Sequence, residues 1–361
     1  MKTLIDGKRI LITGGTGSLG KVLVRRLLSG ANGTPESITI FSRDEAKQHQ
    51  MRIEYLKSSN NPTDEVIYNN FAEKVKFRIG DIRDFNSIAS ALRQADIVFN
   101  TAALKQVPTC EYFPFQAVMT NIMGAENIVR AIANQNLPVH TVVGISTDKA
   151  AKPVNVMGMT KSLQERVFAT GNLECDKTRF VLARYGNVLA SRGSVIPLFH
   201  EQIKKGGPVT ITDDKMTRFL LSLEEAVDVI LYAVEHGHPG ETFIPRIPAA
   251  LVTDIAKVLI ENRKIETKVT GIRPGEKLHE ALITEEEAQR TMIRGPYYVI
   301  GPILPELQLP IHHKGPFLLK EYTSADDLMN YDQTRDLLTK RNLLYNENAN
   351  LADQVHGEML R

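Results

Sequence analysis

The sequence has little cysteine, little excess charge and no long apolar run, and each scarcity excludes a class of protein. Cys110 and Cys175 are its two cysteines, and neither lies in a CxxC or His-Cys cluster, which argues against a disulfide framework and a metal site. Lysine and arginine number 44 against 42 aspartates and glutamates, so no nucleic-acid-binding field is expected. Without a signal peptide or an apolar run of about 18 residues, we expect a cytoplasmic protein that does not span the membrane.

What the sequence does have is a regular alternation of short apolar runs with longer segments of helical spacing. Its 361 residues and 42% hydrophobic content predict one large α/β unit with a smaller appendage. Strands are predicted at 9–13, 37–42, 75–79, 97–100, 141–146 and 180–184, and helices at 19–29, 45–57, 86–92, 121–134 and 157–170. Strands that are apolar on both faces, alternating with helices, predict a doubly wound parallel sheet of the Rossmann type.

The alternation of strands and helices becomes irregular after Gly186. Prolines and glycines separate shorter elements there, and one clear helix is predicted at 223–235. We therefore expect a dinucleotide-binding domain at 1–186, to which later segments return, and a smaller substrate lobe at 187–310. The last thirty residues are charged and rich in asparagine, and we expect residues 311–361 to form a peripheral C-terminal tail. The polar stretch 58–70 is predicted to be an inserted loop.

Glycines recur every third position directly after the first predicted strand. Gly14, Gly17 and Gly20 have the GxxGxxG spacing and precede a helix. Such a loop turns tightly and lets a pyrophosphate approach backbone N–H groups at the helix N-terminus. We expect these glycines, with Thr16, Ser18 and Leu19, to bind a dinucleotide, although a purely structural turn is the alternative.

The ends of the next strands carry candidates for the rest of the cofactor site. Ser42 and Arg43 follow the second strand, where an arginine can neutralise a 2′-phosphate, so NADP is favoured over NAD. Asp44 comes next, and a solvated surface arginine is the other interpretation. Asp81 and Ile82 after the third strand, and Ala102 and Ala103 after the fourth, are expected to line the adenine side and the dinucleotide groove.

Together with later blocks, these motifs resemble a known family from about residue 5 to 290. The matching blocks lie at 13–20, 41–45, 80–84, 102–105, 146–150, 184–188, 191–195, 216–219 and 273–277. The chain is similar to the extended short-chain dehydrogenase/reductases and, more narrowly, to the soluble UDP-N-acetylglucosamine 4,6-dehydratases of polysaccharide biosynthesis. The resemblance implies oxidation at C4 of the sugar, loss of water across C5 and C6, and return of the hydride to C6. It also implies a homo-oligomer, either a dimer or a hexamer.

Thr147, Asp148 and Lys149 directly follow the fifth predicted strand. By resemblance, Asp148 is the acid at C6, Lys149 the base at C5, and Thr147 a hydrogen-bond partner near the C4 oxygen. This chemistry requires a raised pKa for Asp148 and a lowered pKa for Lys149, and we expect burial, with Lys105 and Lys161 nearby, to shift both in that direction. A surface Asp-Lys pair with no role is the alternative.

Met157 stands where most short-chain dehydrogenases have a tyrosine four residues before a lysine, here Lys161. Lys161 is expected to reach the nicotinamide ribose. Methionine cannot exchange a proton, so the C4 hydroxyl proton must leave through Thr147, water or a lysine, unless the protein does not oxidise at all. Met157 is expected to line the sugar pocket, or to be core filler.

Residues of the later blocks are expected to hold the nucleotide sugar, because arginine pairs with phosphate oxygens through two parallel hydrogen bonds. By resemblance these are Asn187, Arg192, Val195, Arg218, Arg273 and Glu276, with Lys105 near the sugar or its diphosphate. Gln106 departs from the histidine that is typical of this block.

Two other functions fit parts of the sequence. A UDP-sugar 4-epimerase would oxidise and re-reduce C4 alone, and would have no use for an acid and a base at C5 and C6. A non-catalytic NADP-binding sensor is the function that Met157 suggests, because fold alone does not fix function. Asp148, Lys149 and the arginines favour the dehydratase.

Overall fold

The computed structural model describes residues 3–57, 62–189 and 194–346, and a single large sheet organises most of them. The strand order is β13-β14-β9-β6-β5-β4-β1-β2-β3. Strands β1 to β6 and β9 run parallel to one another, whereas β14 pairs antiparallel with β9 and β13 antiparallel with β14. The predicted doubly wound α/β fold is thereby confirmed.

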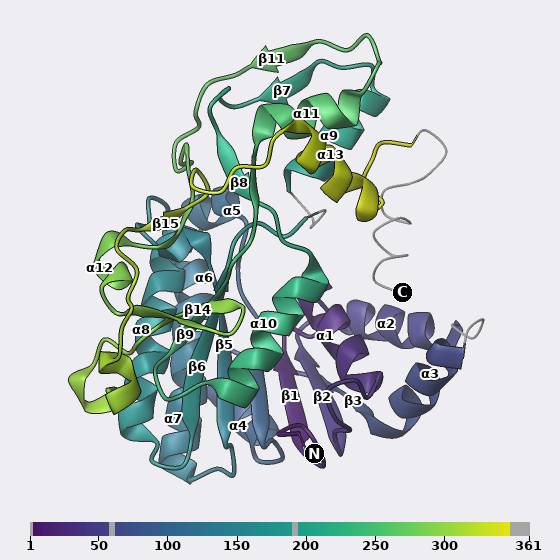
Figure 1. The fold of residues 1–361 in the computed structure, drawn as a ribbon. Coiled ribbons are helices and arrows are strands. Elements are labelled where there is room, and N and C mark those ends of the chain that lie inside the picture. Colours follow the sequence, from purple (N-terminus) through teal and green to yellow (C-terminus); the bar gives the residue numbers. More distant parts are fainter. Residues whose placement is uncertain (1–2, 58–61, 190–193, 347–361) are drawn as a thin grey trace.

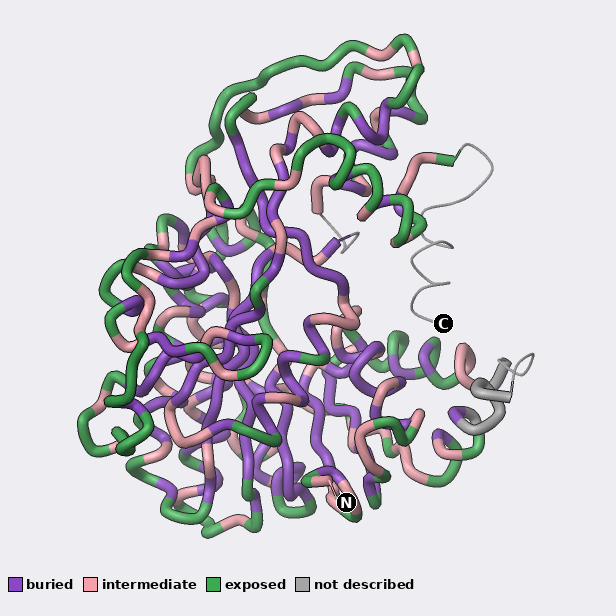
Figure 2. The backbone as a smooth tube through the Cα atoms, viewed as in Figure 1, coloured by how far each residue is buried: buried purple, intermediate pink, exposed green. Residues whose placement is uncertain are grey.

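The sheet strands are β1 (Arg9–Thr13), β2 (Ser37–Ser42), β3 (Val75–Ile79), β4 (Ile97–Asn100), β5 (Thr141–Thr147), β6 (Arg179–Tyr185), β9 (Thr242–Pro245), β13 (Thr291–Arg294) and β14 (Tyr297–Ile300). All six predicted strands are present. The first four have the predicted bounds, and β5 and β6 are slightly longer. Except for β3 at one edge and β13 at the other, these strands are buried over most of their length, and Figure 2 shows the buried centre of the sheet.

Helices cover both faces of the sheet (Figure 1). One face carries α1 (Ser18–Leu28), α2 (Glu45–Lys57), α3 (Pro62–Lys74) and α10 (Leu223–His236), and the other carries α4 (Phe85–Leu92), α7 (Gly124–Gln135) and α8 (Val156–Glu174). Short helices α5 (Val107–Tyr112) and α6 (Pro114–Ala117) and a π-helical stretch, Val118–Met123, precede α7. Leu23 and Val227 pack in the first apolar layer, and Ile128 and Phe168 in the second.

A smaller lobe lies beyond the carboxyl ends of the parallel strands (Figure 1). It contains β7 (Val209–Ile211), β8 (Thr217–Phe219), β10 (Ala249–Leu251), β11 (Thr267–Val269), α9 (Val195–Lys204), α11 (Val252–Ile260) and α13 (Tyr331–Lys340). Its own core includes Ile196, Val209, Ile255 and Leu338. β12 (Ala281–Ile283), α12 (Glu285–Ala288) and β15 (Tyr322–Thr323) lie beside the sheet.

Two segments differ from the expectation. The predicted loop at 58–70 is wrong for most of its length, because α3 begins at Pro62 and buries Ile67 and Phe71, while 58–61 fall outside the described residues. Phe71 stacks on Tyr55 of α2 with the ring centroids 4.3 Å apart. The expected peripheral tail is integrated up to residue 346: β15 pairs with β12, and Leu338 of α13 is buried in the lobe core.

The fold brings the ends of β1 and β4 together at the point where the winding direction of the sheet reverses. β1 pairs with β2 on one side and with β4 on the other. Thr13 Oγ1 donates a hydrogen bond of 2.7 Å to Asn100 Oδ1, which joins the two strand ends. In open α/β sheets this crevice is where ligands bind.

Candidate active site

The glycine loop between β1 and α1 has a backbone that side chains would obstruct. Gly14 has a φ of +68°, and a Cβ atom there would lie 2.8 Å from the Cα of Ala102. A Cβ on Gly20 would lie 2.5 Å from the Cα of Gly15, where the loop meets the helix. Gly17 is the N-cap of α1 and has no side chain to cap the first-turn N–H groups. This loop therefore presents backbone donors in the manner of a phosphate cradle.

The other expected cofactor residues border the same crevice, some buried and some exposed. Thr16 and Ile82 are buried, Ser18 and Leu19 are partly buried, and Ala103 is exposed. Ala102 donates its backbone N–H to Thr13 Oγ1 over 3.3 Å.

Ser42 and Arg43 lie where β2 ends. Ser42 is buried, and its Oγ accepts a hydrogen bond from Gln48 Nε2 at 3.1 Å. The Arg43 side chain is 52% exposed, and its guanidinium lies 3.7 Å from a carboxylate oxygen of Asp81. Asp81 is held more closely by Arg83, at 2.6 Å. Arg43 is thus accessible at the strand end where a 2′-phosphate would be recognised.

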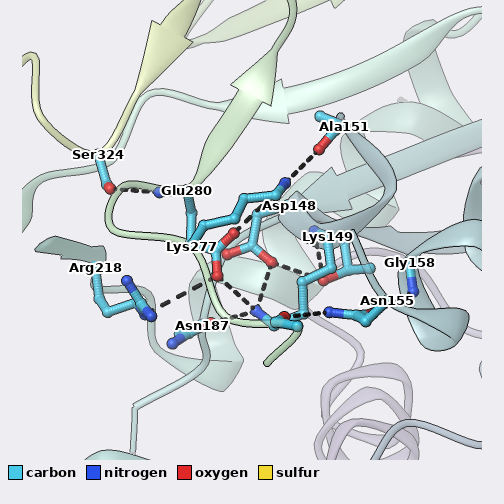
Figure 3. Close-up of polar contacts among 12 residues, drawn as sticks. Asp148, Lys149, Ala151, Asn155, Gly158, Asn187, Arg218, Lys277, Glu280 and Ser324 are labelled. Atoms are coloured by element: carbon cyan, nitrogen blue, oxygen red, sulfur yellow. Dashed lines mark hydrogen bonds and ion pairs between the residues drawn. The ribbon is translucent and has the colours of Figure 1, made fainter. Parts of the chain in front are cut away.

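Beyond β5, the chain makes a 3-10 turn, Asp148–Ala150, that gathers the expected catalytic residues (Figure 3). Thr147 Oγ1 donates to Asp148 Oδ1 over 2.9 Å, and Lys149 Nζ donates to the same oxygen over 3.0 Å. Lys149 Nζ also donates to Asn187 Oδ1 at 3.2 Å. Asp148 is fully buried, whereas the Lys149 side chain is 21% exposed. The side chains of Asp148 and Lys149 therefore lie together in one cluster of polar groups.

Glu280, at the start of β12, completes this cluster, and the sequence analysis missed it. Its Oε1 lies 3.4 Å from Lys149 Nζ and 4.0 Å from Arg218 Nε of β8. Its Oε2 lies 3.8 Å from Lys277 Nζ, which in turn donates to the carbonyl of Ala151 at 2.6 Å. Figure 3 shows these side chains converging from the turn after β5, from β8 and from the loop before β12.

The pKa of Asp148 is shifted in the expected direction, and the pKa of Lys149 is not. Burial raises the pKa of Asp148, and Glu280 adds to the rise. Burial alone would lower the pKa of Lys149, but Asp148 and Glu280 outweigh it and raise that pKa. The expected lowering at Lys149 is therefore wrong for this arrangement. The cation that acts most strongly on Lys149 is Arg218, not Lys105 or Lys161 as expected.

Met157 and Lys161 lie one helical turn apart on α8, as the spacing predicted. Lys161 is 6% exposed and donates to Gln164 Oε1 at 2.7 Å. Burial lowers the pKa of Lys161 to about 7, although Glu165 opposes this shift. Met157 is 6% exposed and packs with Cys110 and Ala117.

The remaining expected substrate residues are spread over the lobe side of the crevice. Arg218 belongs to the central cluster, and its guanidinium donates to the carbonyl of Thr217 at 2.7 Å. Val195 begins α9, Lys105 is exposed after β4, and Arg273 is exposed in the turn that contains the half-buried Glu276. Arg192 lies outside the described residues.

The described residues contain neither a cluster suited to a metal ion nor a membrane-spanning helix. Across 3–57, 62–189 and 194–346, no three His, Cys, Asp or Glu side chains gather as a metal ion would require. In the same ranges, no helix has the length and apolar character needed to cross a bilayer.

Comparison with known proteins assigns the chain to a family. The model of a family described as polysaccharide biosynthesis protein matches residues 10–302. The chain belongs to the polysaccharide biosynthesis protein family. The resemblance drawn from the sequence blocks is thereby confirmed at the level of the family and of the extended short-chain dehydrogenase/reductase fold.

Curated relatives of this family member carry the name of a sugar-nucleotide enzyme. A protein named UDP-glucose 4-epimerase from Rickettsia bellii (strain OSU 85-389) is 43% identical over 353 residues, covering 95% of this chain and 98% of the relative. One with the same name from Rickettsia conorii is 43% identical over 341 residues, covering 92% and 95%. The chain is thus an enzyme of the nucleotide-sugar branch of the extended short-chain dehydrogenase/reductases.

Solved structures agree with this placement. Pen from Bacillus thuringiensis superposes with a TM-score of 0.83 at 32% identity, covering 95% of this chain and all of that one (100%). A dTDP-glucose 4,6-dehydratase, DesIV from Streptomyces venezuelae with NAD bound, has a TM-score of 0.62 at 19% identity and covers 75% and 86%. At that identity the DesIV likeness supports the fold alone.

Proposed function

We propose that the protein is an NADP-dependent 4,6-dehydratase that converts UDP-N-acetylglucosamine to a UDP-4-keto-6-deoxy-N-acetylhexosamine. The observation that carries this proposal is the pairing of a fully buried carboxyl group, Asp148, with an amine, Lys149, on one turn at the carboxyl end of a central strand. Elimination of water needs an acid and a base on neighbouring carbons. A reaction confined to C4 would need no acid at C6 and no base at C5.

The glycine loop fits a dinucleotide. Gly14 lets the loop pack directly against the backbone of Ala102, and the glycine N-cap of α1 has no side chain at the helix N-terminus, where a pyrophosphate would bind. The structural neighbour DesIV has NAD bound. The exposed guanidinium of Arg43 supports NADP, with NAD as the alternative. When bound, the nicotinamide would take up the hydride from C4 and later return it to C6.

In the elimination step, Lys149 would remove the proton from C5 while the C6–O bond breaks. The departing hydroxyl group would leave as water with the proton of Asp148. A raised pKa suits Asp148 to this task, because it favours the protonated carboxyl group that can give up a proton. Lys149 must first lose its own proton. A sugar that enters between its ammonium and the carboxylates would weaken the ion pairs, so that burial again lowers its pKa.

The C4 hydroxyl proton needs another route, because Met157 cannot exchange it. Thr147 Oγ1 lies at the turn and already donates to Asp148 Oδ1, which supports its assignment next to the C4 oxygen. Water or a lysine remains the alternative route. Met157 is buried against Cys110 and Ala117, as expected for a residue that shapes the pocket without acid/base work.

A UDP-sugar 4-epimerase is the second candidate, and the name shared by the Rickettsia relatives at 43% identity favours it. The two functions give different products. We would incubate the purified protein with NADP and either UDP-N-acetylglucosamine or UDP-glucose, and analyse the nucleotide sugars by mass spectrometry and proton NMR. Loss of one water with a 6-methyl signal supports the dehydratase. An unchanged mass with an altered C4 configuration supports the epimerase, and unchanged substrates with bound NADP support the sensor.

Two properties of the proposed enzyme can be measured in the same preparation. Running the reaction in deuterated water and following the C5 signal distinguishes inversion from retention at that carbon. We further propose that the protein forms a homo-oligomer, a dimer or a hexamer. Light scattering coupled to size exclusion measures that state, and a monomer would contradict it.

A further inference from the structure

Lys149 lies between two carboxyl groups that reach it from different parts of the fold. Its Nζ is 3.0 Å from Asp148 Oδ1, 3.2 Å from Asn187 Oδ1 and 3.4 Å from Glu280 Oε1. An ammonium group has three hydrogens, so these three acceptors can satisfy all of them. The catalytic turn supplies only one of the two carboxyl groups, and the segment before β12 supplies the other.

We propose that Glu280 is a positioning residue that acts as the permanent counterion of Lys149 and thereby lets Asp148 keep the proton it delivers. This inference rests on the proposed role of Asp148 as the acid at C6. Glu280 itself accepts no proton and touches no substrate atom in this assignment. It sets which of the two buried carboxyl groups is ionised.

The distribution of cations around the two carboxyl groups favours this division. Glu280 has three cations within 4.0 Å, which are Lys149, Lys277 and Arg218. Among the described residues, Asp148 has an ion pair with Lys149 alone. Because nearby positive charge stabilises an ionised carboxylate, the negative charge is expected on Glu280 and the proton on Asp148.

Hydrogen bonding points to the same assignment. Asp148 Oδ1 accepts from both Thr147 and Lys149, whereas Asp148 Oδ2 is buried with no hydrogen-bond partner among the described residues. A negative charge on this buried, unpaired oxygen would cost more free energy than a neutral hydroxyl group at the same place. Glu280 Oε2 also lacks a hydrogen bond but lies 3.8 Å from Lys277 Nζ.

The backbone of Glu280 is anchored by the segment that follows β15. The backbone N–H of Glu280 donates to Ser324 Oγ at 2.9 Å, next to β15 (Figure 3). The charged groups that face the cluster are Arg218 from β8, Lys277 from the loop before β12, and Lys152 just after the turn, which acts on Lys277. None of these three cations can replace the negative charge of Glu280.

The direct test compares Glu280→Gln with the wild-type protein by trace labelling of Lys149 with acetic anhydride at a series of pH values, read by peptide mass spectrometry. Removing one negative charge about 3.4 Å from the ammonium should lower the labelling midpoint of Lys149 by about one to three pH units. Glu280→Asp keeps the charge and should keep the midpoint near that of the wild type. An unchanged or higher midpoint in Glu280→Gln would overturn the proposal.

A matched control separates this effect from general loss of a buried ion pair. Glu241 is also fully buried and is paired with Arg294 and His312 away from the site. Glu241→Gln should lower thermal stability but leave the Lys149 midpoint unchanged. An equal shift in both variants would mean that the Lys149 midpoint reports on loosened packing, and it would contradict the role of Glu280.

Two further measurements keep the proposal testable if Glu280→Gln does not fold. Carbon-13 NMR of the wild-type protein, with Asp148 assigned through Asp148→Asn, should show a protonated Asp148 and an ionised Glu280 at neutral pH, and the reverse would refute the proposal. In the active enzyme, Glu280→Gln should move both limbs of the pH–rate profile to lower pH, because both groups lose the same negative neighbour. Labelling and NMR need no substrate, so they decide the role of Glu280 even if no keto product forms.

Discussion

Replacing the buried amine of Lys161 with an apolar side chain should change the pH dependence of folding in a defined direction. Lys161 is 6% exposed, and burial lowers its pKa from 10.5 to about 7. At pH values between these two pKa values, the Lys161 amine is protonated in the unfolded chain and deprotonated in the folded protein. The free energy of unfolding therefore rises with pH over this window, and the stability is lost again as the pH falls towards 7.

The size of the effect follows from the shift. One proton contributes about 1.4 kcal/mol per pH unit, so Lys161 should add about 2 kcal/mol between about pH 7 and pH 8.5. The measurement should stop there, because Cys110 and Cys175 have pKa values raised to about 11 from 9.0 and contribute with the opposite sign above about pH 9. Lys161→Met lacks the Lys161 contribution, and it also loses the hydrogen bond to Gln164, at about 1 kcal/mol.

The assay is urea unfolding of nucleotide-free wild-type and Lys161→Met protein at several pH values, followed by circular dichroism. All other titrating groups are common to both proteins and cancel in the difference. We expect the wild type to gain about 2 kcal/mol relative to the variant from pH 7 to pH 8.5. A difference that stays constant with pH would show that the amine titrates normally and would refute the reasoning.

Three further predictions concern the proposed catalytic and cofactor sites. Lys149→Ala should lower turnover by at least about a hundredfold while NADP affinity, measured by calorimetry, stays unchanged; wild-type activity in this variant would remove the assigned base. Gly14→Ala should lower dinucleotide affinity at least about tenfold and destabilise the fold by about 1–2 kcal/mol, because its Cβ would lie 2.8 Å from Ala102 Cα, and normal binding would contradict the cradle. Arg43→Ala should weaken NADP about tenfold and NAD little, since the guanidinium would lose a 2′-phosphate rather than its contact to Asp81; equal loss for both nucleotides would argue against that role.

The large sheet could be predicted from the sequence because its strands are buried on both faces. A run such as Arg9–Thr13 has three successive apolar residues at its centre, and its short length and the glycines that follow it distinguish it from a helix. The same argument placed Thr147, Asp148 and Lys149 at a ligand-binding edge, because carboxyl ends of parallel strands meet there.

The loop predicted at 58–70 was wrong because the prediction used the average polarity of the segment, and α3 begins within it. Residues 58–70 are polar on average, and this average hides Ile67 and leaves out Phe71, the next residue along the chain. Ile67 and Phe71 lie four residues apart, on one helix face, and both are buried against the sheet layer. Pro62 at the first position of the helix is a start signal as well. Spacing, rather than composition, would have identified the element.

The sign of the Lys149 pKa shift could not be predicted, and the reason is geometric. Burial and neighbouring charge act on an amine in opposite directions, so the outcome depends on how many carboxylates lie within a few ångströms. The sequence shows the adjacent Asp148 but gives no sign that Glu280, far along the chain, lies 3.4 Å from the ammonium. Burial favours the neutral amine, and the nearby carboxyl groups of Asp148 and Glu280 outweigh it and favour the charged amine. The second carboxylate therefore changes Lys149 from a ready base into a group that must first be separated from its counterions.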